Sequence, residues 1–346
     1  MTDHPRDPIG HGPAPATQQP VVAAIDIGTQ SVRLLISQGG RTLHRQATVT
    51  HLGRGVRQHG QFDVDTLRVT LDTLSGYAGL LRAHGVSRAR AIATEGVRLA
   101  RDPEVFLQPA AACLGLDIDL VDANEEGRLA FAGAAAGLRD HLGDRGQQSE
   151  DQDGLLVTVD LGGGSCEFAV GREQCEAVCS IPIGASVLTE TYLHRDPPRP
   201  EELSAALSIA AVHLDDVSRA LPQLGADSTL TFVGLGGTFT TMAAIEIGLE
   251  PYDRDRINRF RLDRAAAEDV FRTVVTEPLS ARRHNPGLPE SRTSTILGGS
   301  CAVVAIMRHF SLDAVVISDD DLLDGMVAAL SDAAEVRGHY DAPSWR

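Results

Sequence analysis

The stretch Ile25-Asp26-Ile27-Gly28-Thr29-Gln30-Ser31 decides the fold, because the chain repeats its pattern as Val159-Asp160-Leu161-Gly162-Gly163-Gly164-Ser165. An apolar run precedes the aspartate in each copy, from Val21 to Ile25 and from Leu155 to Val159. Small residues follow the aspartate, and further apolar residues follow the turn. The repeat therefore predicts a buried strand, a tight turn and a second strand, twice in one chain.

Each copy has the chemistry of a phosphate-binding turn. Small residues let successive backbone N–H groups approach an anion closely. A single Asp-x-Gly turn is more often an ordinary hairpin, but two matching copies favour two turns that face one cleft. A third glycine turn, Gly234-Leu235-Gly236-Gly237-Thr238, follows the apolar run from Leu230 to Val233. The two facing copies would place two carboxylates and two rows of amides around one cleft, which suits a metal-bound phosphate chain.

The second copy is followed by another acid, Glu167. Asp160 and Glu167 are an odd number of positions apart, so one continuous strand would point them to opposite faces. If the chain doubles back at the glycine turn, both carboxylates can meet above it. A hard divalent cation requires such oxygen ligands.

Composition excludes several classes of function. All 31 basic residues are arginine, so no lysine is present for a Walker phosphate loop or for Schiff-base chemistry. The net charge of −16, an aromatic content of 4% and the lack of a basic stripe argue against nucleic-acid binding. The five cysteines show no Cys-x-x-Cys pair, which argues against a disulfide framework or a zinc site. The apolar runs are too short to cross a membrane, and we expect a cytoplasmic protein.

At 346 residues the chain is long enough for two domains. We predict two domains, at 21–142 and 155–330, joined by a flexible linker at 143–154. A disordered tail at 1–20 and a polar tail at 331–346 flank them. The last helix of the second domain is a candidate to pack on the first domain. The hydrophobic periodicity predicts helices at 64–81, 200–221, 293–310 and 322–330 and after Asp263, and strands at 90–93 and 314–317.

A series of segments carries a resemblance to a known family. In chain order they are AAIDIGTQSVRLLI from Ala23, AIATEGVRLA from Ala91, NEEGRLAFAGA from Asn124, VDLGGGSCEF from Val159, and then SIPIGASVLTE, FVGLGGTFTTMAA and ISDDDLLDG. The chain resembles the exopolyphosphatase and guanosine pentaphosphate phosphohydrolase (Ppx/GppA) family, within the actin, sugar-kinase and heat-shock ATPase superfamily. The resemblance implies an α/β fold of two ribonuclease-H-like (actin-like ATPase) domains with an active site in the interdomain cleft. It also implies hydrolysis of the terminal phosphate from a phosphoanhydride chain.

The resemblance implies that Glu126 is the general base, with its neighbour Glu125 as the fallback. Acids in a first helical turn also favour the helix dipole, and Asn124 is a suitable N-cap, so these residues have a structural interpretation as well. Arg98 is expected to bind a phosphate oxygen through a charge-assisted fork.

By the same resemblance, Asp160 and Glu167 are expected to hold Mg²⁺ (or Mn²⁺), with Asp26 contributing from the opposite turn. The substrate is expected to be polyphosphate or a phosphorylated guanosine nucleotide. The residues expected to bind it are Gly28, Thr29, Gln30, Ser31, Gly163, Gly164, Ser165, Gly236, Gly237 and Thr238.

Three features depart from the family pattern. Gln30 replaces the usual asparagine, Glu95 replaces a small hydroxyl residue and could pair with Arg98, and the run 319–321 is entirely acidic. The arginines at 254–264 alternate with acids and predict a self-paired surface.

An exopolyphosphatase is the leading hypothesis. The alternatives are a guanosine pentaphosphate phosphohydrolase, a small-molecule kinase of the superfamily and an impaired regulatory phosphate-binding protein. The sequence leaves the oligomeric state open, a homodimer included.

Overall fold

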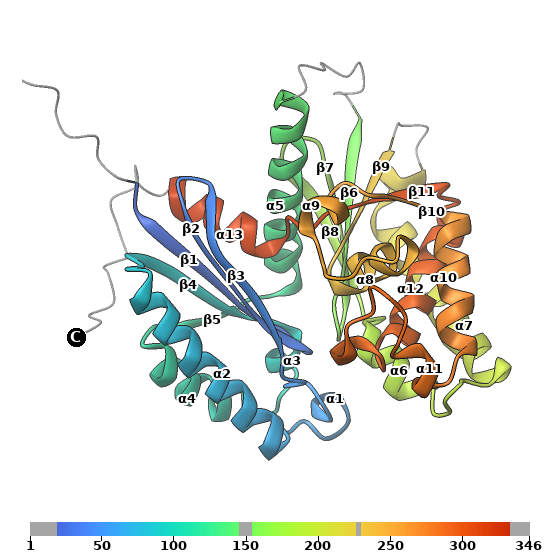
Figure 1. Ribbon diagram of the computed structural model, residues 1–346, viewed down its shortest axis with the longest axis horizontal. Helices are drawn as coiled ribbons and strands as arrows, with labels where there is room; N and C mark the ends of the chain where they lie inside the picture. The colour runs from blue at the N-terminus through green and yellow to red at the C-terminus, as the bar shows by residue number, and fades with distance from the viewer. Residues whose placement is uncertain (1–18, 145–153, 226–229, 333–346) are drawn as a thin grey trace, which may run out of the picture.

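The computed structural model describes residues 19–144, 154–225 and 230–332, which form two α/β halves with a pair of helices between them (Figure 1). The predicted disordered tail, linker and polar tail fall almost entirely outside these residues. The predicted domain boundaries therefore stay predictions.

The first half is built on a five-stranded sheet in the order β3-β2-β1-β4-β5. Its strands are β1 (Val21–Ile27), β2 (Ser31–Gln38), β3 (Arg41–Val49), β4 (Arg88–Ala93) and β5 (Ile118–Leu120). Strand β1 is antiparallel to β2 and parallel to β4, so the first repeat forms a hairpin in the middle of the sheet. The long apolar run of β1 is buried on both faces, as a central strand requires.

The second half repeats this arrangement. Its sheet has the order β10-β11-β9-β6-β7-β8, and β8-β7-β6-β9-β11 matches the first sheet strand for strand and in direction. The strands are β6 (Leu155–Leu161), β7 (Cys166–Gly171), β8 (Cys175–Ile181), β9 (Leu230–Leu235), β10 (Arg261–Asp263) and β11 (Ala314–Ile317). The expected fold class, two ribonuclease-H-like α/β domains, is confirmed.

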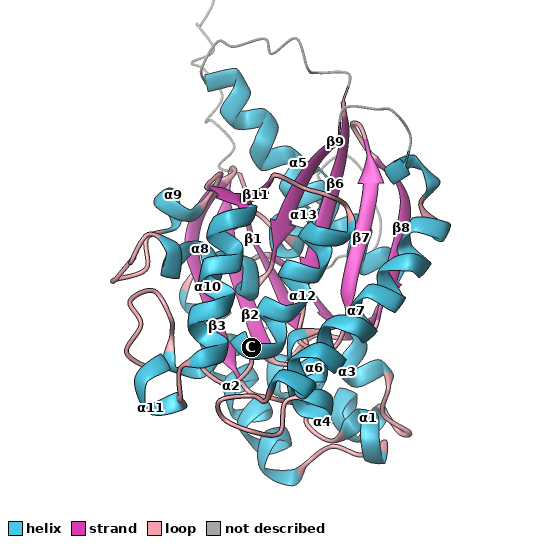
Figure 2. Cartoon of the chain, turned by 90° about the vertical axis from the view of Figure 1, so that its right-hand side faces the viewer, coloured by secondary structure: helices cyan, strands magenta, loops and turns pink. Residues whose placement is uncertain are grey.

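Helices cover the outer face of each sheet. On the first sheet they are α2 (Val64–Ala83) and α4 (Glu104–Leu114); on the second they are α6 (Ala185–Tyr192), α7 (Pro200–Ala220), α8 (Gly237–Glu246), α10 (Arg264–Thr276) and α12 (Ile296–His309). Figure 2 shows the second set in front of its strands. Short helices lie in the connections: α1 (Val56–His59), α3 (Glu95–Arg98), α9 (Arg254–Ile257), α11 (Leu279–Arg282) and the 3₁₀ turns at Pro222–Gly225 and Glu290–Arg292.

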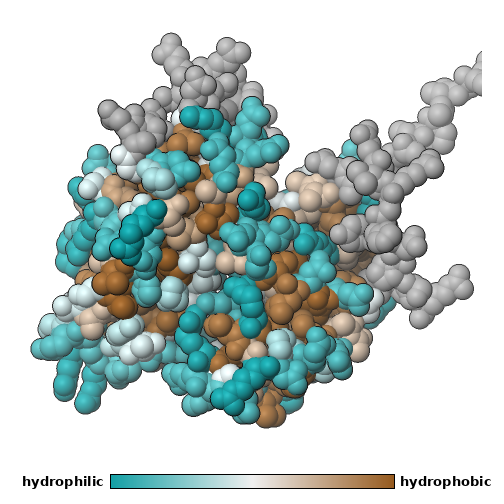
Figure 3. Space-filling view, turned by 180° about the vertical axis from the view of Figure 1, so that it is seen from behind, coloured by the Kyte–Doolittle hydropathy of each residue, from teal (hydrophilic) through white to brown (hydrophobic). Residues whose placement is uncertain are grey.

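Within the described residues no helix is both long and apolar enough to span a bilayer. Seen from behind, the surface mixes hydrophilic and hydrophobic side chains over both halves (Figure 3).

The helices α5 (Ala123–Asp144) and α13 (Leu322–Asp332) form a shared middle layer (Figure 1). Apolar residues of α13 pack with Val22 and Leu35 of the first sheet, whereas Phe131 of α5 packs with Ala169 of the second. The two helices cross at very short distance because each contributes a glycine at the contact. A Cβ on Gly133 would overlap the backbone of the first turn of α13, and one on Gly325 would overlap the backbone of α5.

We predict that Gly133→Ala destabilises the protein by about 1–3 kcal/mol, because the added methyl group forces α5 and α13 apart. Alanine favours an exposed helix by about 1 kcal/mol relative to glycine, so Gly76→Ala in α2 should stabilise the protein instead. A Cβ on Gly76 meets no atom within 4 Å. Urea unfolding of both variants measures the difference, and equal effects would contradict close helix contact at Gly133.

Candidate active site

A cavity of about 530 Å³ lies between the two halves, where the three glycine turns meet. All ten residues expected to bind substrate line it, together with the four acids expected to act in catalysis or metal binding, Asp26, Glu126, Asp160 and Glu167. Among the described residues that form its wall, Arg98 is absent. The fold thus brings together residues that are far apart in sequence.

The peptide groups of the first turn are oriented by the loop 50–53, which follows β3. The carbonyl of Gln30 accepts two N–H bonds from this loop at 2.9 Å, and the carbonyl of Thr29 accepts one at 2.8 Å. In a planar trans peptide the C=O and the next N–H point in opposite directions. The N–H groups of Gln30 and Ser31 therefore point away from the loop, and both residues line the cavity.

The second turn is oriented in the same way by the start of α6. The carbonyl of Gly162 accepts from the helix at 2.9 Å, and that of Gly163 accepts at 2.9 and 3.2 Å. The N–H groups of Gly163 and Gly164 consequently point away from α6, and both residues line the cavity. This contact requires a glycine at 184, because a Cβ there would overlap the carbonyl of Gly163.

The third turn ends at Gly236, whose φ of 86° favours glycine, and α8 begins at Gly237. The first N–H groups of a helix have no partner within it and suit an anion. The guanidinium of Arg292 lies directly against Gly237, where a Cβ would overlap it. Burial and the charge of Arg33 lower the pKa of Arg292, and among the described residues no carboxylate lies within ion-pair distance of it. An anion bound here would stabilise this guanidinium.

Asp160 and Glu167 stand directly opposite each other on β6 and β7, so the hairpin brings both carboxylates to one face. Burial raises the pKa of Glu167 to about 8, against the hydrogen bonds from Ser165 and Ser180. Burial also raises the pKa of Asp160 to about 6, opposed by the charge of Arg33. The site therefore holds carboxylates that are costly to ionise without a nearby cation.

Asp26 lies near the end of β1, in the facing hairpin. Arg33 on β2 donates to its Oδ2 at 2.8 Å, whereas its Oδ1 is buried without a hydrogen-bond partner. Burial raises the pKa of Asp26, and Arg33 opposes the shift. Asp26 thus offers one free oxygen.

Glu126 enters the cavity from the first turn of α5. The side chain of Asp122 caps this helix by accepting from the N–H of Glu125 at 2.9 Å. Asn124 is therefore not the N-cap, because it already lies inside the helix. The Oε2 of Glu126 is buried without a hydrogen-bond partner. Burial raises its pKa well above the ordinary value, and the charge of Glu167 adds to the shift.

The adjacent acid points elsewhere. Glu125 lies 3.4 Å from Arg90, and its side chain is 42% exposed. Of the two neighbouring acids, the structure thus places Glu126 in the cavity wall and leaves Glu125 on the surface.

The expected pair of Glu95 and Arg98 does not form. Glu95 instead pairs with Arg57 at 2.5 Å, and Nη1 of Arg98 donates to the carbonyl of Val121 at 2.6 Å. The helix α3 is only one turn long, so neighbouring segments determine these partners. The charge of Arg98 still favours ionised Glu126, but its guanidinium is engaged outside the cavity wall.

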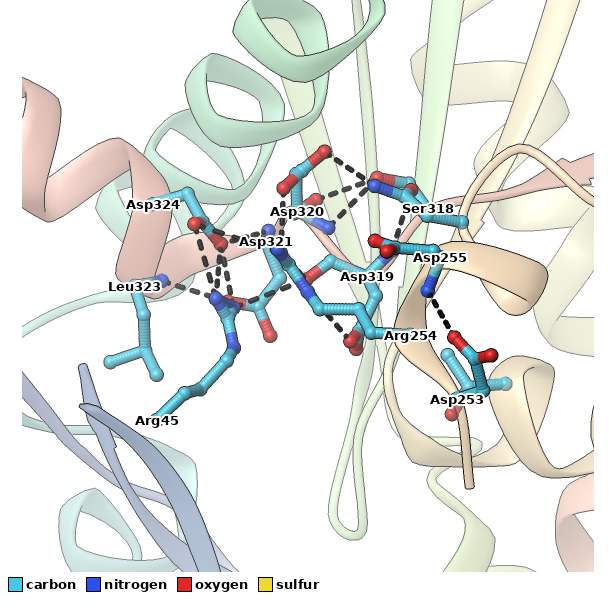
Figure 4. Close-up of polar contacts among 12 residues, drawn as sticks. Arg45, Asp253, Arg254, Asp255, Ser318, Asp319, Asp320, Asp321, Leu323 and Asp324 are labelled. Carbon is cyan, nitrogen blue, oxygen red and sulfur yellow. Dashed lines mark hydrogen bonds and ion pairs between the residues drawn. The ribbon is translucent and has the colours of Figure 1, made fainter. Parts of the chain in front are cut away.

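An acidic turn, defined here as Asp319–Asp324, joins β11 to α13 beside the cavity (Figure 4). Arg254 of α9 reaches it from the second half and pairs with Asp319 at 3.0 Å. Arg45 of β3 reaches it from the first half and pairs with Asp324 at 2.6 Å. The expectation of a self-paired surface is therefore wrong for Arg254, because its partners come from a distant segment.

Sequence reasoning missed several residues of the wall: Arg33, Arg45, Tyr252, Arg254 and Arg292. For Arg33 a signal was present, since it is a charge inside the apolar strand that follows the first turn. Arg292 gave no such signal, because the loop that carries it has no periodic pattern.

Comparison with known proteins establishes the family of this chain. The sequence profile of the Ppx/GppA phosphatase family matches residues 35–333. Exopolyphosphatase 2 of Mycobacterium tuberculosis is 32% identical over 90% of this chain and 98% of that protein. The chain belongs to the Ppx/GppA phosphatase family. The expected family and the expected enzyme class, a phosphoanhydride hydrolase, are thus confirmed.

Other relatives carry a second name. A guanosine-5'-triphosphate,3'-diphosphate pyrophosphatase of Aliivibrio fischeri is 24% identical over 92% of this chain, which spans 60% of that protein. The crystal structure of the Aquifex aeolicus family member has a TM-score of 0.74 at 30% identity and covers 91% of this chain and 99% of that one. An exopolyphosphatase-like protein has a TM-score of 0.83 at 27% identity, with the same coverage.

The carboxylates of this Ppx/GppA phosphatase fit a partial metal site. Within the described residues no group of three or more acidic, histidine or cysteine side chains is close enough to enclose an ion. Mg²⁺ commonly binds through one or two carboxylates and completes its shell with water and substrate phosphate. The free Oδ1 of Asp26 and the pair Asp160 and Glu167 suit that mode, because a dication would offset their cost of ionisation.

The same carboxylates predict how stability depends on pH without metal. Burial raises the pKa of Glu167 from its ordinary value of 4.5 to about 8 in the folded chain. Between these values the unfolded chain binds fewer protons at this residue, so the contribution of Glu167 to the free energy of unfolding falls as pH rises from about 5 to about 8. We predict that Glu167→Gln, which has no proton to lose, makes this decline shallower. Urea unfolding of both proteins in chelator tests it, and parallel pH profiles would contradict the shift.

Proposed function

We propose that this Ppx/GppA phosphatase is an exopolyphosphatase, which hydrolyses the terminal phosphate of inorganic polyphosphate. One observation carries the proposal: the unpartnered, buried carboxylate oxygen of Glu126 lies in a cavity that is also lined by two turns, Gln30–Ser31 and Gly163–Gly164. The carbonyls that precede the N–H groups of these turns are held by segments behind them, so we infer that the N–H groups point inward. Phosphoryl transfer needs little more than positioning, charge neutralisation and an aligned nucleophile. The cavity offers each of them.

In this proposal the inward N–H groups and Arg292 hold the oxygens of the last phosphates. Glu126 accepts a proton from a water molecule as the water oxygen attacks the terminal phosphorus. The bond between this phosphorus and the bridging oxygen breaks, and the electron pair stays on the shortened chain. Orthophosphate and a polyphosphate one unit shorter are the products.

We further propose a divalent cation, Mg²⁺ or Mn²⁺, held by Asp160 and Glu167, with Asp26 contributing from the opposite turn. When bound, the ion neutralises phosphate oxygens. The excess of acids supports its presence, because six carboxylates and four guanidinium groups line the cavity. A polyanion could not enter such a wall without added positive charge.

A guanosine pentaphosphate is the second candidate substrate. Tyr252 lines the cavity and is 51% exposed, so its ring offers a face on which a purine base can stack. Phosphate release from polyphosphate, guanosine pentaphosphate and ATP, measured in parallel with and without Mg²⁺, discriminates the two substrates. Preference for the nucleotide would replace the first proposal.

The role of Glu126 is tested by substitution. Glu126→Gln should lower phosphate release by about a hundredfold or more, because a neutral amide cannot accept the proton of water. Tripolyphosphate binding should persist, since the N–H groups are unchanged. The control is Glu125→Gln, one residue away on the same helix, which should retain activity. An inactive control beside an active Glu126→Gln would assign the role to Glu125.

The metal proposal is tested by titration. Asp160→Asn should raise the Mg²⁺ concentration for half-maximal activity by about tenfold, because a charged oxygen ligand is lost. Asp119→Asn, on an exposed acid that pairs with Arg90 outside the cavity, is the control and should leave the requirement unchanged. Full activity of the unaltered protein in excess chelator would eliminate the metal.

A further inference from the structure

The acidic turn keeps the guanidinium groups nearest to it occupied (Figure 4). Both terminal nitrogens of Arg45 donate to Asp324 at 2.6–3.1 Å, and one also donates to the carbonyl of Asp319 at 3.1 Å. Arg254 donates through Nε to Asp319 at 3.0 Å and through Nη2 to Asp320 at 2.6 Å. A phosphate chain that reached these arginines would have to displace carboxylates that already neutralise them.

Arg292, also in the cavity wall, is in a different state. Within the described part of the chain it has no carboxylate partner. It lies over the start of α8, where the first N–H groups of the helix suit an anion. Asp319 is close enough to Arg292 for its charge to favour the charged guanidinium. A phosphate chain anchored at Arg292 therefore shares the cavity with Asp319, which also lines its wall.

Charge along the cavity is consequently uneven. Around Glu167 the proposed dication offsets the acids, whereas at the acidic turn the acids already outnumber the arginines that contact them: Asp319, Asp320, Asp321 and Asp324 face Arg33, Arg45 and Arg254. Each further phosphate adds negative charge beside this surplus. The negative charges of phosphate and carboxylate in one cavity repel each other, and salt screens this repulsion only weakly because the groups are partly buried.

We propose that the acidic turn limits the length of the phosphate chain, with Asp319 as a specificity-determining residue that disfavours long polyphosphate relative to short. This inference rests on the proposed exopolyphosphatase function. Asp319 lines the cavity with its side chain 23% exposed, so its charge acts on the substrate directly. Its role is to exclude distant phosphates, and it takes no part in the cleavage step.

The same ion pairs also tie the two halves together, because Arg45 and Arg254 come from different halves. Loss of an acid could therefore weaken activity on all substrates for structural reasons alone. A ratio separates the two effects: the KM for long-chain polyphosphate divided by the KM for tripolyphosphate, measured on one preparation at fixed Mg²⁺ and salt. A general structural defect leaves this ratio unchanged.

The test variant is Asp319→Asn, whose amide oxygen can still accept from Nε of Arg254 while the charge is removed. We expect the ratio to fall by about threefold to tenfold, the scale of one charge interaction near a protein surface. Asp313→Asn is the matched control. Asp313 precedes β11 at its other end, is 89% exposed on its side chain and pairs with Arg264 at 3.7 Å, so its ratio should equal that of the unaltered protein.

An unchanged or increased KM ratio in Asp319→Asn would overturn the inference about chain length. The proposed function would still hold in that case, provided that the unaltered protein releases phosphate. Absence of phosphate release from every polyphosphate overturns the proposed function and this inference with it. If Asp319→Asn fails to fold, Asp319→Ser takes its place, because it removes the same charge from the cavity wall. The same fall in the ratio is expected of that variant, and no fall overturns the inference.

Discussion

The site depends on one constraint, the planarity of the peptide group, applied at two facing turns. Carbonyls at Thr29 and Gln30 are held by the loop 50–53, and those at Gly162 and Gly163 by the start of α6. Each N–H that follows a held carbonyl must point the opposite way, and the residues that carry these N–H groups line the cavity. The loop 50–53 and the start of α6 thus fix the direction of these N–H groups by bonding to the carbonyl of the same peptide group. No charged side chain is needed. This pre-organisation is what electrostatic stabilisation of a transferring phosphoryl group requires.

Around this frame the protein buries more acid than base. Glu126 and Glu167 are costly to ionise in their buried positions, and Arg33 offsets only part of the charge of Asp26 and Asp160. Such an arrangement is unfavourable for stability and is typical of a functional site. It provides a place where a bound dication would compensate charge, and it leaves the Oε2 of Glu126 without a hydrogen-bond partner in the cavity wall.

The repeated strand and turn allowed both hairpins to be predicted, because local pattern determines them. The resemblance to the Ppx/GppA family supplied the duplicated fold and most of the cavity wall. Partners that come from distant segments could not be predicted. Glu95 pairs with Arg57 and not with Arg98, Arg254 pairs with the acidic turn, and Arg292 lies over Gly237 only after the loop before α12 folds back. The middle layer of α5 and α13 likewise depends on glycine contacts that no hydrophobic period reveals.

In the proposed mechanism, N–H groups of both turns hold the terminal phosphate while Glu126 faces the attacking water. A crystal structure of the Glu126→Gln variant with tripolyphosphate and Mg²⁺ would show whether they do. We expect phosphate oxygens within hydrogen-bond distance of the N–H groups of Gln30, Ser31, Gly163 and Gly164, with the amide of residue 126 beside the terminal phosphorus. Tripolyphosphate bound along Arg45 and Arg254, with those N–H groups left to solvent, would contradict this mechanism.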